Sequence, residues 1–464
     1  MTLRPWSTAL TCALASAAAF FAAATLAPDS ATPVAAAEAE AHEQAESPPA
    51  LSPRRPRLTR RQRILLNAVR RARTPGVAHA RAVADGQFDP APPPCSPSLT
   101  GLTGPEMSEG TAASVLPLAA GTNPLSAVMI FVDFSDVRAT ESTAELHNKL
   151  VPNARAWYAE ASFGRATLDV TPIHRWFRMA RGSRDYGIQN GLTFEEHKDY
   201  VADAIAAADA DVDFSRYRIV YVVAARGSAL QRSPAFHAMP GDGISADGVE
   251  LRHAATFGED VREVSPQRYG ANVLVHETGH LLGLPDLYDG RAANNSQVFR
   301  FAGEWDTMGS TSTGAHFLAW HKWKLGWIDQ TQLTCLRGPG EVTATISPAA
   351  AAGGLKAVVV PTGPSTAFVI EARRRAGQDA RLCEEGVLIY TVDALVHSGD
   401  GPVRVQPAQP ARNPDLANSC GALYNAPFDR AAGEDAHFQN RAAGLMVDVL
   451  GSSRAGYRVR VTRG

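Results

Sequence analysis

The segment from His276 to Asp286 reads HETGHLLGLPD, and it limits the possible folds more than any other part of the chain. His276 and His280 are four residues apart, so on an α-helix both imidazoles project from one face and can bind a single metal ion. Glu277 follows the first histidine and can reach a water molecule on that ion. The spacing therefore predicts a zinc-binding helix over residues 269–284.

Gly283 and Asp286 extend the motif beyond the helix. Gly283 allows the chain to turn sharply, because glycine tolerates positive φ. The turn brings Asp286 to the metal as a third ligand and leaves a fourth position open for water, which is typical of a catalytic zinc site. Asp289 is the alternative third ligand; otherwise it could accept a hydrogen bond from a ligand histidine or lie at a helix end.

A second motif, WDTMG, follows at residues 305–309. A methionine in a tight turn beneath a three-ligand zinc site is the arrangement found in metzincins. We therefore expect Met308 to form a packing floor under the ligands without binding the metal itself.

Further blocks of sequence resemble the immune inhibitor A family of secreted bacterial metallopeptidases, a metzincin-like group. The blocks are IFVDFSD at 130–136, WY at 157–158, SFG at 162–164, DFS at 213–215, LPDLYD at 284–289, LAWHKWKLGWI at 318–328, FVIEAR at 368–373 and GVLIYTVD at 386–393. The resemblance covers residues 125–393, whereas the loop at 237–248 matches the family only loosely. It implies a zinc endopeptidase with a metzincin-like domain, its ligands His276, His280 and Asp286, its general base Glu277 and its turn residue Met308.

Alternation of apolar strands and helices predicts an α/β (α+β) catalytic domain with a β-rich C-terminal module. We expect strands at 127–134, 166–170, 176–179 and 218–224, and helices at 143–161, 193–208 and 269–284. After residue 330 the expected elements are strands, at 357–361, 367–372, 386–393, 444–450 and 456–462.

The segment before the first expected strand has a different composition. Residues 1–37 combine an early arginine, an Ala-rich apolar run and small residues, which predicts a cleaved signal peptide. Residues 38–120 are basic and Pro-rich; we expect a pro-segment that docks on the acidic remainder as an intramolecular inhibitor, with a solvated spacer as the alternative. The catalytic domain is then predicted at 121–330 and the β-rich module at 331–464.

The chain as a whole carries a formal charge of −2, which argues against a nucleic-acid partner. With the expected signal removed, no stable membrane insertion is predicted. The protein is thus expected to be secreted, and its many Arg and Ala residues with only five Lys suggest a bacterium with a GC-rich genome.

Four cysteines lie beyond the predicted signal, and export permits disulfides. Cys335 and Cys383 flank part of the β region and are the preferred pair. Cys95 could pair with Cys420, or it could ligate the zinc from the pro-segment and hold the enzyme latent.

The leading hypothesis is a secreted zinc metalloendopeptidase that acts on proteins or peptides and is made as a latent precursor. The alternatives are a non-catalytic exported binding protein on the same scaffold and a zinc hydrolase for a non-peptide substrate. Calcium is a possible second cofactor, because the loop from Asp286 to Asp306 holds several Asp and Asn residues. Tyr269, Tyr288 and His316 are equal candidates for a group that stabilises the oxyanion.

Overall fold

The first sheet explains why the predicted strands are apolar on both faces. In the computed structural model, β1 (Leu125–Asp133) lies between β2 (Leu168–Arg178) and β3 (Ile219–Ala224), and both pairings are parallel. Alternate β1 side chains enter two different cores: Met129 and Phe131 face one, Ile130 and Val132 the other. A strand buried on both faces must be largely apolar, and every residue of β1 except Ser126 and Asp133 is.

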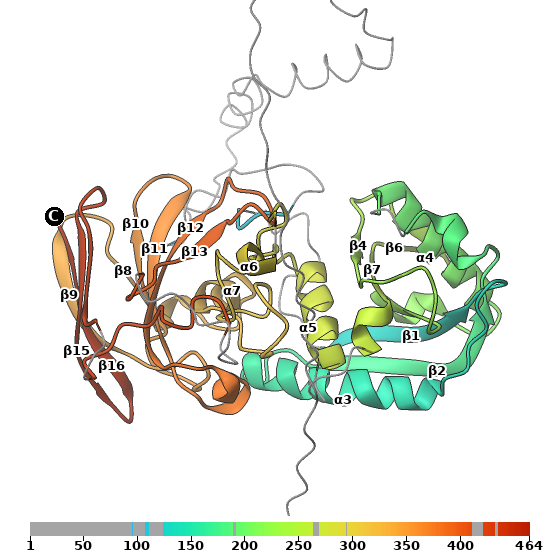
Figure 1. Ribbon diagram of the computed structural model, residues 1–464, viewed down its shortest axis with the longest axis horizontal. Helices are drawn as coiled ribbons and strands as arrows, with labels where there is room; N and C mark the ends of the chain where they lie inside the picture. The colour runs from blue at the N-terminus through green and yellow to red at the C-terminus, as the bar shows by residue number, and fades with distance from the viewer. Residues whose placement is uncertain are drawn as a thin grey trace, which may run out of the picture. The chain divides into compact units, whose positions relative to one another are not determined.

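The sheet has five strands in the order β2-β1-β3-β7-β4. Figure 1 shows its β1 and β2 running side by side. Strand β7 (His253–Phe257) continues the parallel set, and β4 (Ala235–His237) pairs antiparallel with it at the edge. Helices α3 (Thr143–Ala161) and α5 (Tyr269–Leu281) share one core of the sheet, whereas α4 (Phe194–Ala208) packs into the other. The sheet is therefore covered by helices on both faces.

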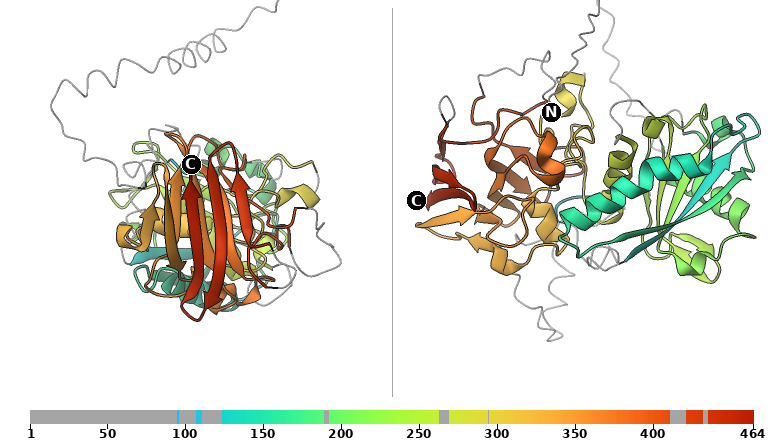
Figure 2. Two further views of the ribbon diagram at one scale, coloured as in Figure 1. Left: turned by 90° about the vertical axis from the view of Figure 1, so that its left-hand side faces the viewer. Right: turned by 90° about the horizontal axis from the view of Figure 1, so that it is seen from below.

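Two further sheets follow in sequence and pack against each other. The inner sheet has the order β13-β12-β11-β10-β8 and the outer sheet the order β14-β15-β16-β9, which faces the viewer in the left view of Figure 2. Their shared core includes Val358, Ile370 and Ile389 from the inner sheet and Val447 and Val459 from the outer sheet.

The opposite face of the inner sheet belongs to the core that contains α3 and α5. Alternate residues of its strands, such as Val359, Val369 and Leu388, join that cluster. The β-rich part thus shares an apolar core with the helix that carries the histidines, and the described residues from Cys95 to Gly464 belong to one compact unit.

The remaining elements are short or lie in the β-rich part. The strands are β5 (Ile244–Ala246), β6 (Val249–Leu251), β8 (Leu333–Cys335), β9 (Gly340–Ile346), β10 (Ala357–Pro361), β11 (Thr366–Arg373), β12 (Gly386–Asp393), β13 (Val403–Val405), β14 (His437–Asn440), β15 (Leu445–Ser453) and β16 (Gly456–Arg463). The helices are α6 (Asn295–Val298), α7 (Ala319–Lys324) and the 3-10 turns η1 (Ser183–Tyr186), η2 (Phe214–Arg216), η3 (Glu259–Arg262), η4 (Gln330–Gln332) and η5 (Gly377–Arg381).

The structure describes residues 95, 107–110, 124–188, 192–262, 269–293, 295–410, 421–431 and 435–464. The predicted signal peptide and most of the predicted pro-segment lie outside these residues. The mixed α/β class is confirmed. The two strands expected at 166–170 and 176–179 are wrong as separate elements, because β2 runs unbroken from Leu168 to Arg178 and absorbs its irregularity in a register shift against β1.

Candidate metal centre

Helix α5 is fixed in the core by hydrogen bonds from two neighbouring elements. The Tyr158 hydroxyl of α3 donates to the Val275 carbonyl at 2.9 Å, and the Tyr221 hydroxyl of β3 lies 2.7 Å from Thr278 Oγ1. These contacts hold the middle turn of the helix, where the two histidines are. The motif therefore stands on a rigid element rather than on a loop.

His276 and His280 are both oriented by backbone carbonyls. His276 Nδ1 donates to the Thr307 carbonyl at 2.9 Å, and His280 Nδ1 donates to the Leu284 carbonyl at 2.8 Å. A carbonyl oxygen can only accept, so each Nδ1 carries a hydrogen and each Nε2 presents a lone pair. The two Nε2 atoms face each other at 3.1 Å.

The turn after α5 brings Asp286 to the same point. Gly283 has a φ of 87°, and the Leu284 N–H donates to the Gly279 carbonyl at 3.0 Å, which closes the helix end. Asp286 Oδ1 then lies 3.1 Å from His276 Nε2 and 3.2 Å from His280 Nε2. Asp289 is not part of this cluster: its carboxylate pairs with Arg300 at 2.6 Å, so the alternative third ligand is wrong.

The chemistry of these three atoms fits a bound zinc ion. Two imidazole lone pairs and a carboxylate oxygen repel one another unless a cation or protons lie between them. Asp286 Oδ1 is buried without a hydrogen-bond donor among the described residues. Separations near 3.1 Å also suit ligands of one ion at about 2.0–2.2 Å from each.

Protons are the alternative occupants when no metal is bound. Burial lowers the pKa of His276 and His280, but the charge and hydrogen bonds of Asp286 outweigh it, so both imidazole pKa values are raised. The two imidazoles in turn hold the pKa of Asp286 well below its usual range against the effect of burial. The three side chains together therefore favour a positive charge, either protons or a cation, between them.

The turn that carries Met308 packs against helix α5. Met308 is fully buried, and its carbonyl accepts from the Leu287 N–H at 3.0 Å. A Cβ added to Gly279 would lie 2.5 Å from Met308 Sδ, so the motif needs glycine at this position to admit the methionine. The sequence did not identify this constraint on Gly279.

Glu277 lies in a cavity of about 520 Å³ beside the three ligand atoms. Burial raises the pKa of this carboxyl to about 8, with further effects from the charges of Asp286 and Asp260, and the neighbouring His276 opposes them. A cation on the ligand atoms would favour the ionised form. The residue is therefore close to the pKa that suits a general base near neutrality.

The three candidates for oxyanion stabilisation can be distinguished by where their side chains lie. Tyr288 lines the cavity, and its ring stacks at 6.2 Å from the ring of His276. Burial and nearby Asp286 raise the pKa of its hydroxyl, so the hydroxyl keeps its proton and can donate. His316 is fully buried away from the cavity, where it contacts Glu160, so it is not a site residue. The Tyr269 side chain lies outside the described residues.

Ser398, which sequence reasoning missed, holds Asp286. The Asp286 N–H donates to Ser398 Oγ at 2.8 Å, and Ser398 Oγ donates to Asp286 Oδ2 at 3.2 Å. The Gly399 N–H donates to the Asp286 carbonyl at 3.1 Å. These contacts come from the loop after β12, more than a hundred residues away, and no local pattern marks them.

Asp260 and Ser233 were also missed, and they shape the cavity wall. Asp260 is buried and accepts from the Ser233 N–H at 2.9 Å and from Ser233 Oγ at 2.6 Å. Ser233 lines the cavity and leads into edge strand β4.

The expected Cys335–Cys383 disulfide is wrong. Cys383 is disulfide-bonded, but Cys335 is a thiol, so the partner of Cys383 lies outside the described residues. The Cys335 thiol instead forms a hydrogen bond with the buried Cys95, whose pKa is raised by burial and by this contact. Cys95 is therefore not positioned as a zinc ligand.

The loop from Asp286 to Asp306, a possible calcium site, has few carboxylates without a cationic partner. Asp289 pairs with Arg300, and Asp306 pairs with His321. Within the described residues, His276, His280 and Asp286 form the one group of three or more potential ligands close enough to hold an ion.

No helix in the described part of the chain is long and apolar enough to cross a membrane. Comparison with protein-family models and with curated proteins gives no match for this chain.

Proposed function

We propose that this chain is a zinc-dependent endopeptidase of the metzincin type, similar to the immune inhibitor A family. The observation that carries the proposal is the meeting of three ligand atoms within about 3 Å of one another beside Glu277, in an open cavity. A structural zinc site would be closed by a fourth protein ligand.

Zinc bound to His276, His280 and Asp286 would supply an activated water and a Lewis acid for a substrate carbonyl. Glu277 takes a proton from the water and passes it to the leaving amine. Tyr288 donates a hydrogen bond to the carbonyl oxygen of the substrate as negative charge develops there.

The cavity walls favour a polymeric chain as substrate. Ile188, Leu192 and Leu230 line an apolar side that suits a hydrophobic side chain. Pro234 and Ala235 line it as well, and β4 is the edge strand of its sheet. An extended peptide can pair with the backbone of an edge strand while its side chains enter the cavity.

Secretion as a latent precursor belongs to the same proposal. Its support is the predicted signal at residues 1–37 and the basic character of residues 38–81 before an acidic remainder. The purified full chain is expected to remove part of its own front segment only when zinc is present.

The experiment is to measure zinc content and casein hydrolysis for the secreted protein, for Glu277→Gln and for the exposed control Glu145→Gln. We expect the wild type and the control to bind about one zinc and cleave casein. The Glu277 variant should keep the zinc and lose about 10²–10⁴-fold in rate, the usual contribution of a general base. Wild type that binds zinc but cleaves nothing, even after removal of its front segment, would instead favour an exported binding protein.

A further inference from the structure

A four-residue segment far upstream in the sequence lies at the metal centre. Residues Met107–Gly110 fall within the predicted pro-segment, yet Ser108 and Glu109 are fully buried. Ser108 forms an antiparallel bridge with His397, and Met107 lines the cavity together with the ligand residues.

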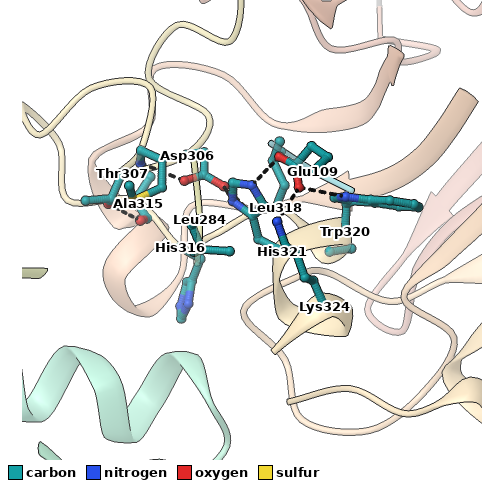
Figure 3. Close-up of polar contacts among 12 residues, drawn as sticks. Glu109, Leu284, Asp306, Thr307, Ala315, His316, Leu318, Trp320, His321 and Lys324 are labelled. Atoms are coloured by element: carbon teal, nitrogen blue, oxygen red, sulfur yellow. Dashed lines mark hydrogen bonds and ion pairs between the residues drawn. The ribbon is translucent and has the colours of Figure 1, made fainter. Parts of the chain in front are cut away.

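Glu109 is the centre of a buried ionic network (Figure 3). Its Oε1 lies 2.7 Å from His321 Nε2, and its Oε2 accepts from Trp320 Nε1 at 3.0 Å and from Lys324 Nζ at 3.3 Å. His321 and Glu109 have no exposed side-chain surface. Without Glu109, His321 and the largely buried Lys324 would lose a carboxylate that compensates their positive charge.

The network continues from His321 to the Met turn. His321 Nδ1 donates to Asp306 Oδ2 at 2.8 Å, and the other Asp306 oxygen accepts from the Met308 N–H at 2.7 Å. The next residue, Thr307, supplies the carbonyl that orients His276. Glu109 is thus linked to one zinc ligand through His321, Asp306 and the turn.

The other end of the segment supports a different ligand. The Ser398 N–H donates to the Met107 carbonyl at 2.8 Å, and Ser398 holds Asp286. Gly110 packs so closely on the same loop that an added Cβ would lie 2.8 Å from the Ala394 carbonyl oxygen. The segment therefore lies between the supports of His276 and of Asp286.

We propose that Met107–Gly110 is a lasting part of the active protein, in which Glu109 acts as a positioning residue for the metal centre, so that any maturation cut falls before Met107. The inference rests on the proposed zinc site but not on the nature of the substrate. The inference limits the part of the predicted pro-segment that maturation can remove to the residues before Met107.

The first test is the N-terminus of the zinc-loaded, secreted protein after maturation, measured by intact mass and N-terminal sequencing. We expect a first residue at or before Met107. A zinc-loaded form that begins after Gly110 would overturn the inference. This measurement requires no variant. It therefore tests the inference even if substitutions at Glu109 prevent folding.

The second test is zinc affinity, measured by competition with a chelator, for Glu109→Gln and for the control Asp133→Asn. Asp133 is also buried and pairs with an arginine, Arg178, but it lies outside the cavity and the ligand set. Supporting residues typically change metal affinity by about 10–100-fold, and Glu109 acts indirectly, so we expect about a tenfold loss. The control should retain wild-type affinity. Equal affinities for wild type and Glu109→Gln would show that Glu109 does not position the centre.

These outcomes are distinct from failure of the proposed peptidase. A protein that binds zinc but never cleaves peptides would overturn the proposed function. Its zinc affinities and its N-terminus would still test whether Glu109 positions the metal centre.

Discussion

The two histidines and the aspartate of the proposed zinc site are held in different ways. His276 and His280 project from one buried helix, and a backbone carbonyl fixes each ring. Asp286 follows a turn and depends on the hydroxyl of Ser398, which comes from the loop of another sheet. The helical half of the centre is therefore held largely by its own helix, whereas the aspartate half also depends on contacts from the β-rich part.

This difference implies unequal sensitivity to substitution. A ligand on a packed helix is also held by the helix itself, so it should lose less when a single distant support changes. A ligand on a loop relies on each of its few supports. Substitutions in the β-rich part should therefore lower the metal affinity, even where the substituted residue does not contact the metal. Substitutions in the two halves should therefore differ in their effect on zinc affinity.

The largest effect is expected for His280→Ala, which removes a ligand from the helical half. Zinc affinity should fall by more than the factor of about 10–100 that is typical for supporting residues. Chelator competition measures the loss. Retention of wild-type affinity would mean that the three-atom cluster is not the zinc site.

Ser398→Ala removes the support of Asp286 and should weaken zinc binding by about 10–100-fold. The matched control is Ser365→Ala, which deletes a hydroxyl that donates to Asp393 at 3.2 Å elsewhere in the β-rich part. We expect the control to bind zinc as the wild type does. If Ser398→Ala also binds normally, Asp286 is positioned by its own turn and the contrast fails.

Gly279→Ala adds a Cβ 2.5 Å from Met308 Sδ and 3.3 Å from Phe317 Cζ. Overpacking of this kind costs about 1–3 kcal/mol of folding free energy, and we expect only a small change in zinc affinity. Urea unfolding of the single variant and of Gly279→Ala with Met308→Ala checks the cause, because the smaller side chain should relieve the clash. Gly338→Ala, with open space around the added Cβ, is the control.

The smallest effect on the centre is expected from pH acting through His321. Burial lowers the pKa of His321, but the charges of Glu109 and Asp306 outweigh it and raise the pKa to about 9. A raised pKa means that this stabilisation is complete below the unfolded value of about 6.5 and is lost as the pH rises through 9. The free energy of unfolding should therefore fall between these pH values, and less steeply in Glu109→Gln. If the free energy of unfolding fell equally steeply with pH in the wild type and in Glu109→Gln, a charged pair of His321 and Glu109 would be contradicted.

Much of the fold could be predicted from the sequence where a strand is buried on both faces or a helix is buried on one. The expected helix at 143–161 and the strands at 357–361 and 386–393 have the predicted bounds. Strands β4 to β9, β13 and β14 were missed. Except for β7 and β9, they have only three or four residues, which carry too little periodicity to predict a strand.

By itself, the sequence determined the placement of His276, Glu277 and His280, since helical spacing brings the two histidines to one face. It also marked Gly283 as the turn that brings Asp286 to them. The tertiary structure alone decided that Ser398 holds Asp286, that Cys95 contacts Cys335, and that the buried Glu109 contacts His321. These contacts join residues more than a hundred positions apart, and their geometry depends on how the sheets pack, which no local pattern encodes.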